Sequence, residues 1–179
     1  MSCNLTAGFT KGCKDNMGGI RKVWLTNKDG INEVTPAVGS TSPLDEGIIT
    51  AITMAGSPAA VFYEFTPNKD SSNWVENIQS NVQNGTIAYE QVLTLMFAKN
   101  EATKRNQIKL LGQAELVAIV LDKNGLYWYL GEENGLELTG GSSASGTAMT
   151  DMNGWTLTLS GSERNPAREV DEDVIDTVI

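Results

Sequence analysis

The chain has 179 residues, of which 40% are apolar and 20% charged, with no histidine and a formal net charge of −9. A chain of this size buries roughly 70% of the surface that its unfolded form exposes, so one domain with a real core is expected. The acidic balance argues against nucleic-acid binding through phosphates, and the lack of histidine excludes serine–histidine triads and two-histidine metal sites.

The N-terminal stretch MSCNLTAGFTKGCKDN lacks the basic end and apolar middle of a signal peptide, so synthesis in the cytoplasm is expected. No apolar run approaches the roughly 20 residues that a membrane-spanning helix needs. Cys3 and Cys13 form no CxxC pair and cannot complete a tetrahedral zinc site without histidine. We expect free thiols in a reducing cytosol, and a disulfide between them stays the alternative for an oxidising location.

The first quarter of the chain alternates between strands and irregular segments. Residues 1–19 are rich in glycine and small polar residues and predict an irregular arm. Residues 27–30 (NKDG) predict a turn, and residues 33–47, which contain two prolines, predict a long loop. The strands predicted before residue 70 are 20–26, 48–56 and 60–67.

The clearest prediction is a hairpin over 74–98 whose turn centres on Asn84-Gly85, the pair that best tolerates a type I′ turn. Apolar and polar residues alternate along both strands, so one face of the hairpin is expected to join the core. The other face is polar and mostly uncharged, and its members include Asn77, Gln79, Asn81, Thr86 and Glu90.

The second half of the chain predicts one helix followed by strands. Residues 100–112 predict a helix that Asn100 caps and Gly112 ends, with a thin apolar stripe typical of a helix on the outside of a sheet. Small residues over 139–150 predict a flexible surface loop. The tail has helical apolar spacing but β-branched side chains, so strand and helix both stay open there. The strands predicted in this half are 115–122, 126–132 and 154–163.

These elements, about eight strands and one helix, predict an α+β fold that is predominantly β, an antiparallel sandwich or barrel with one flanking helix. We divide the chain into an N-terminal arm (1–19), the β domain (20–163) and an acidic C-terminal arm (164–179).

The repeated words DKNG (122–125) and DMNG (151–154) raise the question of a calcium loop. An EF-hand loop needs glycine at position 6 and glutamate at position 12. Counting from Asp122 places Tyr127 at position 6, and counting from Asp151 places Ser162 at position 12. Both frames fail, so these words predict turns, and no metal or other cofactor is expected.

Two further stretches carry residue types that are used in catalysis or in stacking on a ligand. Glu132, Glu133 and Glu137 offer carboxylates for an acid/base pair, but adjacent acids at a turn are usually solvated, so no enzyme is expected. In LYWYL, Tyr127 and Tyr129 share a strand face opposite Trp128, which favours core packing and an interface over stacking of bases. A hydrolase with an acidic pair stays the most distant alternative.

Residues from about 74 to 170 resemble the tail tube proteins of bacteriophages and of contractile injection systems. The resemblance lies in the order of the QNG hairpin, the helix NEATKRNQIKLLG, the strand ELVAIVLD, and then NGLYWYLGEENGLELTGG and DMNGWTLTLSGSE. It implies a β-sandwich or barrel that assembles into six-membered rings, which stack into a tube in the virion tail. The implied partners are further copies of the chain, other virion proteins and DNA that passes without tight binding.

The resemblance carries no catalytic residue and implies no membrane partner, but it implies two surfaces. The polar hairpin face would line the lumen, and the alternative that it only meets solvent stays open. Other virion components (a tail terminator, a connector or a head decoration protein) are alternatives, as is a small-molecule-binding barrel with Trp24, Trp128 and Trp155 around its pocket. The residues expected at ring-stacking interfaces are Thr35, Pro36, Ser40, Pro43, Asp45, Glu169, Asp171 and Asp173.

Overall fold

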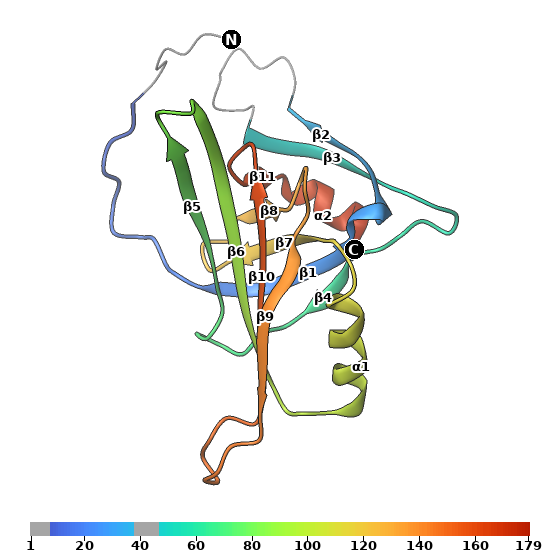
Figure 1. The fold of residues 1–179 in the computed structure, drawn as a ribbon. Coiled ribbons are helices and arrows are strands. Elements are labelled where there is room, and N and C mark those ends of the chain that lie inside the picture. The colour runs from blue at the N-terminus through green and yellow to red at the C-terminus, as the bar shows by residue number, and fades with distance from the viewer. Residues whose placement is uncertain (1–7, 38–46) are drawn as a thin grey trace.

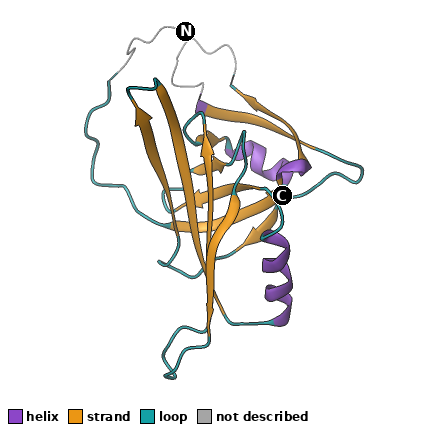
Figure 2. Ribbon diagram, viewed as in Figure 1, coloured by secondary structure: helices purple, strands orange, loops and turns teal. Residues whose placement is uncertain are grey.

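The computed structural model describes residues 8–37 and 47–179, which form eleven strands, two α-helices and one short 3-10 helix, η1 (Lys28–Gly30). The strands make two open sheets that pack face to face as a sandwich (Figure 1). The predicted fold class, α+β and predominantly β, is therefore confirmed, and of its two expected forms the described strands adopt the sandwich (Figure 2).

The larger sheet has seven strands, antiparallel except for the parallel pair β11–β3. Their spatial order is β2 (Ile31–Pro36), β3 (Ile48–Met54), β11 (Arg168–Val170), β8 (Tyr127–Leu130), β7 (Leu116–Asp122), β1 (Ile20–Asn27) and β4 (Tyr63–Phe65). The smaller sheet is fully antiparallel, and its order is β5 (Asn73–Asn81), β6 (Thr86–Ala98), β10 (Gly154–Glu163) and β9 (Glu137–Ala144).

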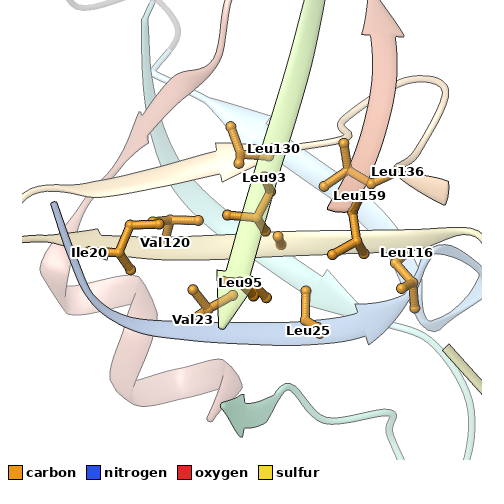
Figure 3. Close-up of a cluster of buried hydrophobic side chains, with 11 residues drawn as sticks. Ile20, Val23, Leu25, Leu93, Leu95, Leu116, Val120, Leu130, Leu136 and Leu159 are labelled. Carbon is orange, nitrogen blue, oxygen red and sulfur yellow. The ribbon is translucent and has the colours of Figure 1, made fainter. Parts of the chain in front are cut away.

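The main core lies between the two sheets, where β6 and β10 cross β1 and β7 (Figures 1 and 3). Its side chains come from alternating positions along these strands, since every second residue of a strand points to the same face. Leu93 and Leu95 of β6 and Leu159 of β10 have no exposed surface, and they meet Val23 and Leu25 of β1. Each fully buried leucine contributes about 1.5–3 kcal/mol through removal of apolar surface from water.

A second core lies on the other face of the seven-stranded sheet, beneath α2 (Glu172–Val178). Val174 and Ile175 of α2 pack there with Tyr129 of β8. Trp128 of the same strand packs into the main core, so the prediction that Tyr127 and Tyr129 share a face opposite Trp128 is confirmed.

The C-terminal segment differs from the prediction of an arm. Residues 168–170 form β11 in the interior of the seven-stranded sheet, and residues 172–178 form α2 with three buried side chains. The tail therefore contains both kinds of element that its sequence left open, a strand followed by a helix. Pairing with β3 and β8 satisfies the backbone of β11, and burial of the apolar face of α2 fixes the helix.

Four local predictions need correction. Residues 31–36 form β2, so the first four residues of the predicted loop 33–47 are strand, and residues 137–144 form β9 although glycine and serine predicted a loop. Only Gly85 (φ +64) has a positive φ in the hairpin turn, and the loop spans 82–85, so the turn is not type I′. The helix α1 (Ala102–Leu111) has Glu101, not Asn100, at its N-cap, and the Glu101 side chain makes no capping hydrogen bond. The side chain of Asn100 instead donates to the carbonyl of Ala144.

In the part of the chain that the structure describes, no helix has the length and apolar character to cross a membrane.

Candidate assembly surface

The four-stranded sheet has one face in the main core and one face turned away from it. Strand register places the residues of this outward face opposite one another, and none of them is buried. They are Asn73, Val75, Asn77, Gln79 and Asn81 on β5; Thr86, Ala88, Glu90, Val92, Thr94 and Met96 on β6; Thr156, Thr158, Ser160 and Ser162 on β10; and Glu137, Gly140 and Ser142 on β9.

The residues predicted for a lumen all lie on this outward face. Asn77 pairs with Glu90 and Asn81 with Thr86, while the amide of Gln79 donates to the carboxylate of Glu90 at 2.9 Å. The alternation of residues along the hairpin was therefore sufficient to predict that these five side chains share one face.

Charge on the four strands has one sign. None of the 13 lysine and arginine residues of the chain lies in β5, β6, β10 or β9. The outward face carries the carboxylates of Glu90 and Glu137 among threonine, serine, asparagine and glutamine, with a few apolar residues (Val75, Ala88, Val92 and Met96). These strands therefore present no lysine or arginine side chain that could pair with a phosphate group.

Both edges of the smaller sheet are free in the described part of the chain, because β5 pairs only with β6 and β9 only with β10. A free edge presents backbone N–H and C=O groups that can pair with another strand. β9 also carries only small side chains from Gly140 to Ala144, so another strand can approach its backbone closely.

Toward the turn end of β6 the main core contains polar side chains. Their hydrogen bonds form a network that attaches the smaller sheet to the larger one. Gln91, 2% exposed, accepts from the backbone N–H of Gly131 at 2.9 Å and donates to Glu76. Glu76 also accepts from the N–H of Ala167 at 2.7 Å. Glu163, 3% exposed, accepts from the backbone of the loop after β8.

The glutamates considered for acid/base chemistry do not converge on a common site. Glu132 pairs with Arg168 at 3.3 Å, Glu133 lies 3.8 Å from Arg164, and Glu137 pairs across the outward face with Ser160. Burial raises the pKa of Glu132 above its usual value, while the neighbouring Arg168 acts in the opposite direction.

The aspartates of DKNG and DMNG bond to backbone groups. Asp122 accepts from the N–H groups of Asn124 (2.7 Å) and Leu126 (3.0 Å) in the β7–β8 turn. Asp151 accepts from two N–H groups in the β9–β10 loop, and these bonds lower its pKa. Among residues 8–37 and 47–179 no cluster of three histidine, cysteine, aspartate or glutamate side chains has the arrangement of a metal site.

The three tryptophans proposed around a ligand pocket lie in different places. Trp24 is buried in the core beneath α2, Trp128 packs on Trp74, and Trp155 lies under the guanidinium of Arg105. A different groove of about 550 Å³ lies beside α1, and its apolar lining is Phe65, Phe97, Ile108, Leu111 and Leu157.

The residues predicted for ring stacking are dispersed. Thr35 and Pro36 lie on β2, at one edge of the larger sheet, and Glu169 is paired inside that sheet. Asp171 caps α2, and Asp173 is exposed in its first turn. The other three, Ser40, Pro43 and Asp45, lie outside the described residues.

Comparisons of the chain with protein-family models, with curated proteins and with solved structures find no match.

Proposed function

We propose that this chain is a bacteriophage tail tube subunit, which acts by self-assembly into stacked six-membered rings around a conduit for DNA. The observation that carries the proposal is the four-stranded sheet, with two free edges and an outward face of uncharged and acidic residues only. If the β5 edge of one protomer pairs with the β9 edge of the next, the sheets join into one barrel whose outward faces line the lumen.

The stagger of the sheet supports barrel closure. Asn77, in the middle of β5, is opposite Glu90 of β6, which is opposite Ser162 near the end of β10. Strands that close into a barrel must tilt, by about 35–45° in typical cases, and such a stagger between neighbours accompanies the tilt.

The chemistry of the outward face supports passage of DNA. A duplex that moves through a conduit must not bind its wall, and binding of the phosphate backbone depends on lysine and arginine. Glu90 and Glu137 repel phosphate, while the small uncharged side chains between them have no strong attraction for it.

Size-exclusion chromatography with negative-stain microscopy tests the assembly. Rings or tubes are expected at high protein concentration, and a strict monomer there would overturn the proposal. Rings that never stack would instead favour a tail terminator or connector.

Cysteine cross-linking tests the strand pairing. In a Cys3→Ser/Cys13→Ser background, Asn77→Cys on β5 is combined with Ser142→Cys on β9, or with Gly140→Cys to allow for a register shift. Oxidation should give a ladder of linked protomers that ends at the hexamer, while each single-cysteine variant should give no ladder. Absence of a ladder from rings of both double variants would contradict pairing of β5 with β9.

A second candidate is a small-molecule-binding protein, which the groove beside α1 favours because its volume of about 550 Å³ lies in the range of ligand sites. An apolar dye that binds the protein and is displaced by a specific ligand would support it. An Ile108→Lys variant should abolish such binding and leave ring formation unchanged.

A further inference from the structure

The β5–β6 hairpin extends beyond β1, β7 and β8 of the larger sheet (Figure 1), and side chains on its core side become exposed near the turn. On β6 the residues of this side change from Leu93 and Gln91, at most 2% exposed, to half-buried Tyr89 and then to Ile87, which is 53% exposed. On β5, Ile78 lies opposite Tyr89 and is 65% exposed. Among residues 8–37 and 47–179, no layer therefore lies beneath the last two residue pairs on the core side of the hairpin.

We call this uncovered area the hairpin underside; it consists of Ile78, Ser80, Ile87 and Tyr89. It carries no charge and is mainly apolar, whereas the outward face of the same part of the hairpin carries Asn77, Gln79 and Glu90. A hairpin that met water on both sides would have no physical reason to keep isoleucine on one side only. An uncovered two-stranded hairpin is also marginally stable in water. The underside thus has the composition of a surface that another layer covers.

The free edge of β5 indicates what covers it. A strand of another protein that pairs with this edge extends the sheet. The layer that packs on the core side of that strand within the other protein then lies beneath the hairpin. The chain itself offers such a strand, since β9 is the other free edge of the same sheet and carries small side chains. An uncharged contact also suits two copies that each carry a net charge of −9, because acidic groups buried against one another would repel.

We infer that the hairpin underside packs on a second copy of this chain, on the core side of the strand that pairs with β5. The inference rests on the proposed function, because the contact belongs to the same ring. It adds that side-chain burial beneath the hairpin, and not edge pairing alone, holds neighbouring protomers together.

The test replaces both isoleucines with threonine, which keeps the β-branched shape that strands favour (Ile78→Thr with Ile87→Thr). Loss of apolar burial at two positions should raise the protein concentration for half-assembly by about tenfold or more. Sedimentation velocity over a dilution series measures this concentration. Leu110→Gln on α1 is the matched control, since Leu110 is 57% exposed and lies outside both the hairpin and β9; it should assemble as the wild type does.

Three outcomes would overturn the inference. The first is a double variant that assembles at the wild-type concentration. The second is a loss of assembly that the Leu110→Gln control shares. The third is a monomeric double variant that unfolds at a much lower temperature than the wild-type monomer, because the underside would then be covered within its own chain. A wild-type chain that never assembles would instead count against the proposed function.

Discussion

Trp74 at the base of β5 packs on Trp128 of β8, with ring centroids 5.5 Å apart and an interplanar angle of 43°. This pair lies at the margin of the main core and joins the hairpin strand to the larger sheet. Since β5 is an edge strand whose other apolar residues, Val75 and Ile78, are exposed, the indole pair is its principal apolar attachment. The orientation of the proposed ring contact therefore depends on it.

Trp74→Ala should lower the free energy of unfolding of the monomer by about 2–3 kcal/mol, because it removes a large, partly buried aromatic side chain. Urea unfolding followed by circular dichroism measures the change. Trp74→Phe, which keeps an aromatic contact with Trp128, should retain most of the stability. An alanine variant as stable as the wild type would mean that the hairpin is attached by other contacts.

Gln91→Leu should lower the free energy of unfolding by about 1–3 kcal/mol, since the buried N–H of Gly131 loses its acceptor and Glu76 loses a donor. The side chains differ little in volume, so the effect reports hydrogen bonding. Thr94→Ser, on the outward face of the same strand, should change stability by less than about 0.5 kcal/mol. Equal stability of Gln91→Leu and Thr94→Ser would contradict a structural role for the Gln91 network.

Glu132 should contribute a pH dependence to stability. Burial raises its pKa in the folded chain, so the folded state binds the proton more tightly than the unfolded state does. This contribution is fully present below the ordinary glutamate pKa of 4.5 and is lost as pH rises through the higher folded pKa. The difference in unfolding free energy between wild type and Glu132→Gln should therefore fall as pH rises from 4 to 7, roughly the range of a raised carboxyl pKa. A difference that stays constant would mean that Arg168 cancels the effect of burial, and one that rises would mean that Arg168 outweighs it.

Asp122 should act as a turn residue and not as a metal ligand. Asp122→Ala removes the acceptor for two backbone N–H groups and should cost about 1–2 kcal/mol. Asp122→Asn, which keeps one side-chain oxygen, should cost less. Thermal unfolding of the wild type should be the same in calcium and in EDTA, and a calcium-dependent rise in midpoint would show that the sequence DKNG binds metal after all.

The sequence predicted strands accurately where apolar and polar residues alternate regularly, and it missed them where no such pattern exists. Strand 154–163 was predicted with its observed bounds, because leucine and threonine alternate strictly and both faces of β10 are specified. β9 was missed, since a run of glycine and serine has no periodicity and becomes a strand only through its register with β10. β11 has only three residues, and its place between β3 and β8 depends on contacts distant in sequence.

The candidate surface was partly predictable for the same reason. Alternation alone assigned Asn77 and Gln79 to the face opposite the core, and the register confirms that assignment. It could not reveal that Ile78 and Ile87 are exposed, because a pattern identifies the core side of a strand but not where the opposing sheet ends. The polar network at Gln91 was also missed, since its partners, Gly131 and Glu76, lie in separate segments of the chain.

The charge of the outward face should decide whether assembled protein releases or retains DNA. Asn77→Lys with Gln79→Lys places two cations on this face of each protomer, at exposed positions where stability should change little. Assembled wild type should bind labelled duplex DNA weakly, while the assembled double variant should bind it with an affinity that falls steeply as salt is raised. Fluorescence anisotropy between about 50 and 200 mM salt measures the slope.

Ala51→Lys with Thr53→Lys is the matched control for this experiment. Both residues are exposed, uncharged and two apart on β3, in the other sheet, so the charge gained per protomer is the same. If the outward face of the four-stranded sheet lines the conduit, lysines on β5 concentrate around the lumen and should raise DNA affinity more than lysines on β3 do. Equal affinity of the two assembled variants would mean that DNA responds to net charge alone, and that the outward face of the four-stranded sheet is not the surface it meets.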